Sequence, residues 1–211
     1  MGADQVRLSL IQMSVKSKNI KAISHPVSDQ DRWQRQGHMG GVMWFTGLPG
    51  SGKSTLAFEL ERRIFDAGRQ VYVLDGDNLR YGLNSDLGFS HQDRTENIRR
   101  VGEVAALYAG AGMIALTAFI SPYREDRAGA RNAAGSHFHE IYLSASVEVC
   151  EGRDPKGHYK KAREGKIPEF TGVSAPYEAP EKPELIIDTG ALTVGDSLDI
   201  LEEYVDRNFG M

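Results

Sequence analysis

Residues 47–55 read GLPGSGKST, and this short stretch constrains the fold more than any other part of the chain. It fits the pattern G-x-x-x-x-G-K-[ST] in full. An apolar run bounded by glycines, residues 41–47, precedes it, as is typical of a buried parallel strand. An amphipathic run, residues 53–67, follows it and stops at Gly68. The sequence therefore predicts a strand, a phosphate-binding loop and a helix; the alternative is a glycine-rich turn that binds nothing.

The residues of this loop explain how it would hold a phosphate. Glycines let backbone N–H groups converge on phosphate oxygens, and the N-terminus of the following helix adds partial positive charge. Lys53 would reach the outer phosphates of a nucleotide, and the Ser54 hydroxyl can ligate Mg²⁺. We expect the nucleotide to contact Gly47, Leu48, Pro49, Gly50, Ser51, Gly52, Lys53, Ser54 and Thr55.

Strand-like and helix-like segments alternate along the rest of the chain. This alternation predicts an α/β fold with a mainly parallel, five-stranded sheet and helices on both faces. Ligands of such sheets bind beyond the carboxyl ends of the strands, where Gly47, Asp75, Ser121 and Asp188 fall. We predict strands at residues 41–47, 70–77, 112–121, 138–144 and 184–190, and helices at residues 53–67, 95–108, 123–133, 146–153 and 194–204.

Composition narrows the classes of function. The formal net charge of −4 argues against a general nucleic-acid or membrane-surface binder, which needs a basic face. No apolar run approaches the length of a membrane span, and the first residues lack a secretory signal pattern. A single cysteine, Cys150, fits a cytoplasmic protein and is expected to be a packed residue rather than a nucleophile.

The N-terminal 40 residues differ from the remainder. They are polar and show little periodicity, so we expect residues 1–40 to be a partly mobile extension of a domain that spans residues 41–211. Within the extension, residues 7–15 alternate weakly and could form a short strand, and residues 29–37 could form a surface helix that ends at Gly37.

Two acidic residues follow the second predicted strand. Asp75 and Asp77 flank Gly76 at the strand end, where they are expected to face a bound nucleotide. Asp77 could accept a proton from an incoming hydroxyl or hold Mg²⁺ through water. The alternative is an Asx turn that only shapes a loop, which explains one acidic residue more readily than two.

A polar segment, residues 77–100, carries more arginine than a helix surface needs. Arginine forks suit phosphate or sulfate oxygens, and Phe89 lies among them, where an aromatic ring could stack on a base. An equally good alternative is pairing with acidic neighbours on a solvated face. The arginines are Arg80, Arg94, Arg99 and Arg100, and the acidic neighbours are Asp86, Asp93 and Glu96.

Three long motifs resemble the adenylylsulfate kinases (APS kinases). They read LDGDNLRYGLNSDLGFSHQDRTENIRRVGEVAAL, AFISPYREDR and RDPKGHYKKAREGKIPEFTGVSAPYEAPEKPEL, and the similarity extends from about Ser24 to the C-terminus. The resemblance implies a P-loop kinase fold, a Mg²⁺ cofactor, and transfer of the γ-phosphoryl of ATP to the 3′-hydroxyl of adenosine 5′-phosphosulfate. It also implies a homodimer and possible association or fusion with ATP sulfurylase.

The resemblance also assigns roles to individual residues. Lys53, Asp75, Asp77 and Ser121 would be catalytic, and Ser54 and Asp77 would hold the metal. In some members the serine that matches Ser121 is phosphorylated, although transfer does not require it. Residues 154–172 would form a lid over both nucleotides. Arg153 and Thr189 would border the ATP adenine, and the acceptor would contact Asp77, Arg80, Phe89, Arg94, Asn97, Ile120, Ser121, Lys156 and Phe170, with Phe89 and Phe170 enclosing its adenine.

Three positions depart from the family pattern: Pro49, Tyr81 and His158 stand where Ser, His and Leu are usual. None is assigned to the chemistry.

Two other functions compete with this interpretation. One is a P-loop kinase acting on a sugar, shikimate or a nucleoside monophosphate, which would share the loop but not the paired aromatics. The other is a non-catalytic nucleotide-binding module, against which Lys53 and the two acidic residues argue.

Overall fold

The computed structural model describes residues 19, 21 and 23–211. Its centre is one five-stranded sheet in the order β2-β3-β1-β4-β5, and all neighbouring strands are parallel. The predicted fold class is therefore confirmed. The strands are β1 (Gly41–Thr46), β2 (Val71–Asp75), β3 (Ile114–Ala118), β4 (Phe138–Ser144) and β5 (Leu185–Asp188).

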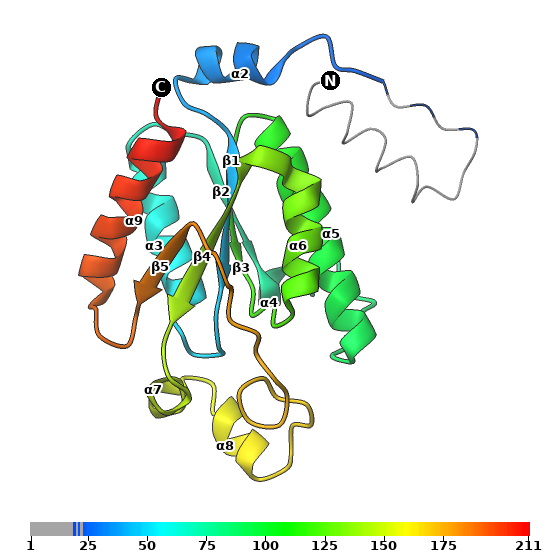
Figure 1. The fold of residues 1–211 in the computed structure, drawn as a ribbon, viewed down its shortest axis with the longest axis vertical. Helices are drawn as coiled ribbons and strands as arrows, with labels where there is room; N and C mark the ends of the chain where they lie inside the picture. The colour runs from blue at the N-terminus through cyan, green and yellow to red at the C-terminus, as the bar shows by residue number, and fades with distance from the viewer. Residues whose placement is uncertain (1–18, 20, 22) are drawn as a thin grey trace.

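Helices cover both faces of the sheet (Figure 1). One face packs against α3 (Lys53–Asp66) and α9 (Val194–Phe209), and the other against α5 (His91–Gly110) and α6 (Arg124–Ala134). The remaining helical elements are α2 (Asp29–Gln36), α4 (Gly76–Leu79), α7 (Val147–Arg153), α8 (His158–Arg163) and the short 3₁₀ turn η1 (Gly135–His137).

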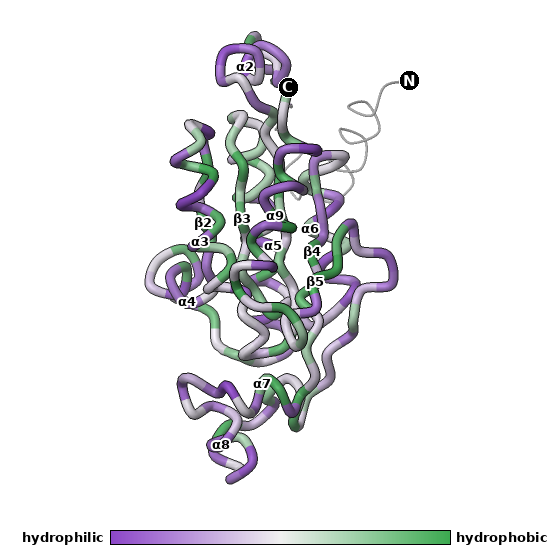
Figure 2. The backbone as a smooth tube through the Cα atoms, turned by 90° about the vertical axis from the view of Figure 1, so that its left-hand side faces the viewer, coloured by the Kyte–Doolittle hydropathy of each residue, from purple (hydrophilic) through white to green (hydrophobic). Residues whose placement is uncertain are grey.

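The middle strand β1 shows how the sequence sets the core. All six of its residues are buried, because helices pack on both sides of it. Met43 and Phe45 belong to the cluster under α3 and α9, whereas Val42 and Trp44 belong to the cluster under α5 and α6. Alternate side chains of this strand thus pack into the two halves of the core, one on each face of the sheet. Figure 2 shows hydrophobic residues running through the strands and the adjoining helices.

Several short helices lie at the carboxyl ends of the strands. There α4 follows directly on β2, and α7 and α8 project beyond the sheet, while α2 lies at the opposite end (Figures 1 and 2). Gly37 ends α2 in the left-handed conformation with φ +73°, as the sequence predicts. Among the described residues, no helix is long and apolar enough to cross a bilayer. The weak strand expected at residues 7–15 lies outside the described residues.

The helices differ from the sequence-based prediction chiefly at the start of α5, at the end of α9, and in two short helices that were not predicted. Helix α5 begins at His91 rather than at residue 95, because the Ser90 hydroxyl accepts the Asp93 backbone N–H at 3.2 Å. Helix α9 continues to Phe209, whose ring is buried in the core. The sequence analysis missed α4 and α8, since elements this short carry no usable periodicity.

Candidate active site

A cavity of about 620 Å³ opens at the carboxyl edge of the sheet. The phosphate-binding loop forms one wall, and the end of β2, the first turn of α5 and the turn after β3 form others, with the start of the lid segment across them. Most of the predicted site residues meet here: the cavity is lined by Pro49, Gly50, Ser51, Gly52, Lys53, Ser54, Thr55, Asp75, Asp77, Arg80, Phe89, Arg94, Asn97, Ile120, Ser121, Arg153, Lys156 and Thr189.

Two glycines of the loop, Gly47 and Gly50, are required by close packing. Gly47 has φ +155°, and a Cβ there would lie 2.7 Å from the Leu143 carbonyl oxygen of β4. Gly50 has φ +78°, and a Cβ would lie 2.8 Å from the Cys150 carbonyl oxygen of α7. Only glycine satisfies both the backbone conformation and the space at these positions. The loop is therefore pressed onto β4 and α7, and its remaining side, with the N-terminus of α3, faces the cavity.

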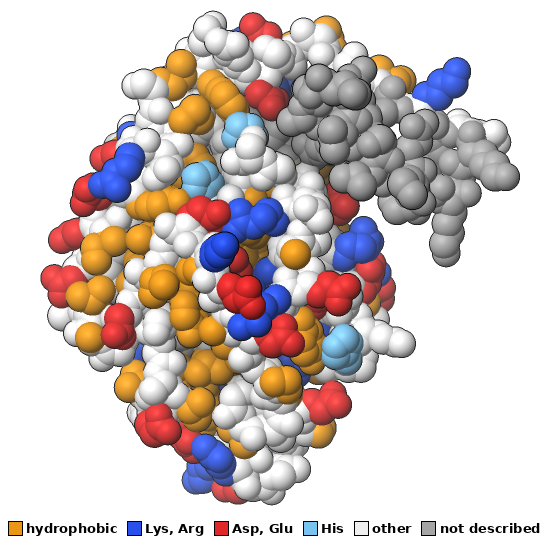
Figure 3. All heavy atoms as spheres, viewed as in Figure 1, with side chains coloured by type: hydrophobic (Ala, Val, Ile, Leu, Met, Phe, Trp, Pro, Cys, Tyr) orange, Lys and Arg blue, Asp and Glu red, His pale blue; other side chains and the backbone are white. Residues whose placement is uncertain are grey.

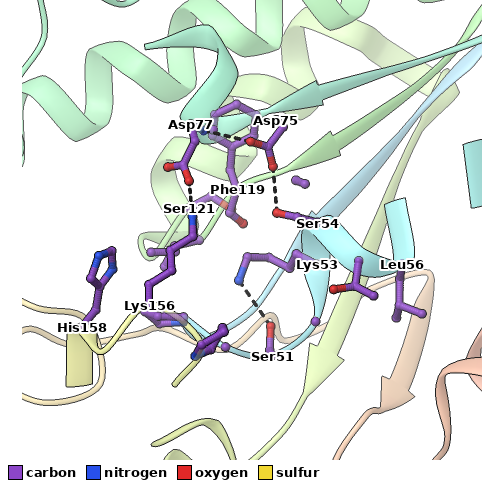
Figure 4. Close-up of a pocket in the computed structure, with 18 of the residues that line it drawn as sticks. Ser51, Lys53, Ser54, Leu56, Asp75, Asp77, Phe119, Ser121, Lys156 and His158 are labelled. Atoms are coloured by element: carbon purple, nitrogen blue, oxygen red, sulfur yellow. Dashed lines mark hydrogen bonds and ion pairs between the residues drawn. The ribbon is translucent and has the colours of Figure 1, made fainter. Parts of the chain in front are cut away.

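Lys53 extends from the first turn of α3 into the loop (Figure 4). Its ammonium donates to the carbonyl oxygens of Gly47 at 2.9 Å and Leu48 at 2.7 Å, and to the Ser51 hydroxyl at 3.3 Å. Burial lowers the pKa of Lys53 to about 8, and the nearby Cys150 and Asp75 oppose this shift only in part. A phosphate placed in the loop would restore the preference for the charged form.

The two acidic residues after β2 have different surroundings. Asp75 is buried and accepts the Ser54 hydroxyl at 2.7 Å and the Asp77 backbone N–H at 3.0 Å, so it joins the start of α3 to the cap of α4. Asp77 has a 68% exposed side chain and pairs with Lys156 of the lid segment (Figure 4). This pairing raises the pKa of Lys156. Both carboxylates face the same cavity from one strand end.

The arginines of residues 77–100 divide into two groups. Arg99 and Arg100 pair with Glu96, and Arg100 also pairs with Asp86, as the alternative interpretation expected for all of them. Arg80 and Arg94 instead line the cavity and donate to backbone carbonyl oxygens. Of the four arginines that the sequence offers for binding an anion, only Arg80 and Arg94 therefore lie at the cavity.

Arg80 and Arg94 both hold the loop that carries Phe89. Arg80 donates to the carbonyl oxygens of Leu87 and Gly88, each at 3.0 Å, and its guanidinium lies 4.3 Å from the centre of the Phe89 ring. Arg94 donates to the Phe89 carbonyl oxygen at 2.9 Å and reaches across to the lid segment at Glu169 and Thr171. The Phe89 ring itself is 66% exposed, so one of its faces is available.

Three predicted site residues lie outside the cavity lining: Gly47, Leu48 and Phe170. Gly47 and Leu48 offer Lys53 their carbonyl oxygens instead. Phe170 is buried in a separate lid cluster with Cys150 and Tyr159, with its ring centre 5.0 Å from that of Tyr159. The structure thus brings Phe89 to the cavity and keeps Phe170 inside the lid.

The lid segment is attached to the phosphate-binding loop at several points. The Tyr159 hydroxyl donates to the Pro49 carbonyl oxygen at 2.9 Å, and Leu48 packs against the lid cluster. Just before the lid, Arg153 donates to the carbonyl oxygens of Gly50 and Thr189. The lid and the loop therefore form one wall of the cavity.

Sequence reasoning missed several residues that line this cavity, among them Phe119 and Tyr159. Phe119 lines the cavity beneath Gly76 and stacks with Trp44 at 6.1 Å between ring centres. Its place at the end of an apolar run was a usable signal, because strand ends face ligands in this fold. Tyr159 supplies the lid cluster and the contact with Pro49, and nothing in its local sequence distinguishes it from a surface tyrosine of a basic loop.

Comparison with known proteins agrees with this geometry. The family model for adenylylsulphate kinase matches residues 39–188. The chain is 54% identical to the adenylyl-sulfate kinase of Staphylococcus epidermidis over 92% of this chain and 98% of the relative.

Solved structures give the same result. The APS kinase CysC of Mycobacterium tuberculosis, in complex with AMPPNP and APS, superimposes with a TM-score of 0.77 at 45% identity, covering 80% of this chain and 98% of that one. A hexameric APS kinase from Thiobacillus denitrificans matches with a TM-score of 0.62 at 34% identity, covering 82% of this chain and 31% of that one. The chain belongs to the adenylylsulphate kinase family.

Proposed function

We propose that this protein transfers the γ-phosphoryl group of ATP to the 3′-hydroxyl of adenosine 5′-phosphosulfate, which yields ADP and 3′-phosphoadenosine 5′-phosphosulfate. One observation carries the proposal beyond family membership. The phosphate-binding loop and the Phe89 loop with its two arginines line a single cavity, and Asp77 lines the same cavity. A donor and an acceptor bound on these two sides would present their reacting groups near that carboxylate.

The donor side would hold the triphosphate through the loop N–H groups of residues 47–55 and the N-terminus of α3. Lys53 would release the loop carbonyl oxygens and turn to the outer phosphates, whose negative charge keeps it protonated. Arg153 and Thr189, which are already hydrogen-bonded to each other, would border the adenine of ATP.

The Mg²⁺ that accompanies ATP fits the oxygen donors at this place. Ser54 and Asp75 are 2.7 Å apart, and Asp77 follows on the same strand end, so hydroxyl and carboxylate oxygens gather beside the loop. Magnesium in kinases takes one or two protein oxygens together with phosphates and water. Ser54 would be the direct protein ligand, with Asp77 or Asp75 acting through water. When bound, the ion neutralises charge on the β- and γ-phosphates.

Asp77 would act on the acceptor. Its exposed carboxylate is paired with Lys156 and has no contact that fixes it in the protein core. It would orient the 3′-hydroxyl or accept its proton, while Lys53 stabilises the charge on the transferring group. Lys156, once released from Asp77, would contact the acceptor from the lid.

The acceptor would occupy the side that is lined by Arg80, Phe89, Arg94, Asn97 and the turn at Ile120 and Ser121. Phe89 offers a free ring face for the adenine, and the guanidinium groups offer charge for the phosphosulfate. Phe170 would supply a second aromatic face only if the lid rearranged, since its ring is buried against Tyr159. Ser121 is assigned to the acceptor wall rather than to phosphate transfer, because its hydroxyl accepts the Trp44 indole N–H at 3.1 Å and is buried.

We further propose that residues 41–211 form the catalytic domain, with residues 154–172 as its lid and residues 1–40 as an extension. A chain with one cysteine suits the reducing cytoplasm. We also propose that the protein forms a homodimer or a larger assembly with itself. A second proposed partner is ATP sulfurylase. Light scattering tests the first, and co-purification with the sulfurylase tests the second.

The function is tested by acceptor competition. Purified protein with ATP and Mg²⁺ should release ADP rapidly with adenosine 5′-phosphosulfate, and slowly with shikimate, gluconate or AMP. Equal or faster release with any of those three acceptors would overturn the proposal. ADP release without any acceptor supplies the background rate.

A further inference from the structure

A buried arginine lies directly behind the acceptor side of the cavity. Arg127 of α6 is 3% exposed, and its guanidinium makes three short hydrogen bonds. It donates to the Glu140 carboxylate of β4 at 2.6 Å and to the backbone carbonyl oxygens of Ser121 and Glu178, each at 2.7 Å. Of these four residues only Ser121 lines the cavity. Arg127 can therefore act on the site only through the chain segments to which it is hydrogen-bonded.

The first of these segments is the turn after β3. Ser121 has φ +40°, a strained conformation that residues other than glycine rarely adopt. Such a conformation persists only where several contacts fix it. Here Arg127 holds the carbonyl oxygen, while the Ser121 hydroxyl lies 3.1 Å from the Trp44 indole nitrogen and 3.0 Å from the Thr46 hydroxyl. The strained turn presents Ile120 and Ser121 to the cavity.

The second segment is the strap, residues 177–181, which connects the lid to the chain that enters β5. The Glu178 backbone N–H donates to the Pro122 carbonyl oxygen at 2.9 Å, and the Tyr177 and Thr46 hydroxyls lie 2.9 Å apart. At the surface, Arg124 pairs with Glu181. Figure 3 shows basic and acidic side chains gathered in the middle of the face of the molecule that is turned to the viewer. Arg127 thus joins the strap to the Ser121 turn from beneath.

The ion pair alone does not account for this arrangement. Replacing a buried ion pair by apolar side chains of similar volume is often neutral or stabilising, so a buried Arg–Glu pair is weak evidence for a role in stability. What an apolar pair cannot reproduce is the two hydrogen bonds that Arg127 donates to Ser121 and Glu178. Those two bonds connect the wall of the acceptor site to the end of the lid.

We propose that Arg127 is a positioning residue for the acceptor: it holds the Ser121 turn in its strained conformation and fixes the strap to it, with Glu140 balancing its charge. The proposal rests on the proposed function for the identity of the acceptor. Loss of Arg127 relaxes the turn and withdraws Ile120 and Ser121 from the cavity wall. The donor side, formed by the phosphate-binding loop and α3, is unaffected.

The test replaces both charged partners, so that no unpaired charge stays buried. The double variant Arg127→Met/Glu140→Met is compared with the wild type and with Arg63→Met, which removes an arginine paired with Asp199 and Glu202 on the surface of α3 and α9. We expect the KM for adenosine 5′-phosphosulfate to rise about tenfold or more in the double variant, because acceptor binding must then return the relaxed turn to its strained conformation. The affinity for a non-hydrolysable ATP analogue, measured by calorimetry, should change less than about twofold.

Two results would overturn the proposal: an unchanged acceptor KM in the folded double variant, or an equal loss of acceptor and ATP-analogue affinity. If the double variant does not fold, the single variant Arg127→Lys provides the test of the proposal. A single ammonium keeps the charge opposite Glu140 but cannot span Glu140, Ser121 and Glu178, so the same selective rise in acceptor KM is expected.

A spectroscopic measurement separates this proposal from the proposed function. The chain has two tryptophans, so a Trp33→Phe background leaves Trp44, whose indole N–H donates to Ser121, as the only one. In that background the double variant should shift Trp44 emission to the red and increase its quenching by acrylamide, whereas Arg63→Met should change neither. An unaltered Trp44 signal would refute the positioning role even if the enzyme were active. A wild type that did not use adenosine 5′-phosphosulfate would refute the function alone.

Discussion

Lys156 of the lid segment and Asp77 of α4, the helix that follows β2, form an ion pair, and both residues line the cavity. Both side chains are more than half exposed, at 60% and 68%, so the pair contributes below about 1 kcal/mol to stability. A contact of this strength holds Lys156 near the carboxylate only weakly. The pair can therefore be exchanged for contacts with an acceptor that enters beside Asp77.

Replacing Asp77 by asparagine should affect the reaction far more than binding. Removal of a group that orients or deprotonates the acceptor hydroxyl lowers kcat by about 10²–10⁴-fold. The affinity for a non-hydrolysable ATP analogue, measured by calorimetry, should stay within a few fold. Asp199→Asn, a change on the surface of α9, is the matched control and should leave both values unchanged. Equal losses of turnover and nucleotide affinity would contradict this role for Asp77.

Lys156→Met should raise the acceptor KM while leaving the melting temperature nearly unchanged. The exposed pair with Asp77 adds little stability, but the ammonium would be lost from the acceptor side of the cavity. Lys161→Met, on the exposed surface of α8, provides the control. Steady-state kinetics and thermal melts of the three proteins decide the point. A melting temperature that fell with no change in the acceptor KM would show that Lys156 serves the fold.

ATP binding should take up protons near pH 8. Burial lowers the pKa of Lys53 to about 8 in the ligand-free protein, so half of the molecules carry a neutral amine there. Phosphate oxygens raise that pKa again, and the complex therefore binds a proton that the free protein lacks. Calorimetry in buffers with different ionisation enthalpies measures the uptake, which should be smaller at pH 6.5. Lys53→Arg, charged throughout, should show none; uptake that persisted there would assign the proton to another group.

The lowered pKa of Lys53 also makes the free energy of unfolding depend on pH. The folded-state pKa of Lys53, about 8, lies below its unfolded value, so the unfolded chain binds more protons between the two. The contribution of Lys53 to the free energy of unfolding therefore rises as the pH increases from about 8 toward 10. Chemical denaturation of wild type and Lys53→Met should show this difference in slope over that range. Parallel pH profiles would contradict the shifted pKa.

Phe89→Ala and Phe170→Ala should behave differently, although the sequence groups the two rings together. Phe89 is 66% exposed, so its loss should leave stability intact and raise the acceptor KM about tenfold, as loss of one stacking face implies. Phe170 is buried in the lid cluster, so its loss should open the lid segment to proteolysis. Kinetics and limited proteolysis of both variants test this. Equal protease sensitivity would argue against separate roles.

The fold was predictable because its signals are local and strong. The buried β1 run, the glycine-bounded loop and the apolar repeat of α3 each specify their own structure, and the alternation of elements implies the parallel sheet. The boundaries of α5 and α9 were less predictable, since they depend on the Ser90 cap and on the burial of Phe209 in the tertiary structure.

The candidate site was predictable in its residues but not in its contacts. Spacing identified Asp75 and Asp77, yet only the structure separates a buried residue tied to Ser54 from an exposed one paired with the lid. Likewise, residue type and spacing alone do not distinguish Arg94, which lines the cavity, from Arg100, which pairs with acidic neighbours; only the family resemblance separates them. Such differences depend on residues far apart in the chain.

The central claim is the identity and position of the transferred phosphate. Purified protein is incubated with ATP, Mg²⁺ and adenosine 5′-phosphosulfate, and the nucleotide product is isolated and analysed by mass spectrometry and ³¹P NMR. A product that gains one phosphoryl group, with the new resonance coupled to the ribose 3′ proton and the phosphosulfate intact, is the predicted result. ATP consumption with no such product, or a phosphate at any other position, would contradict the account.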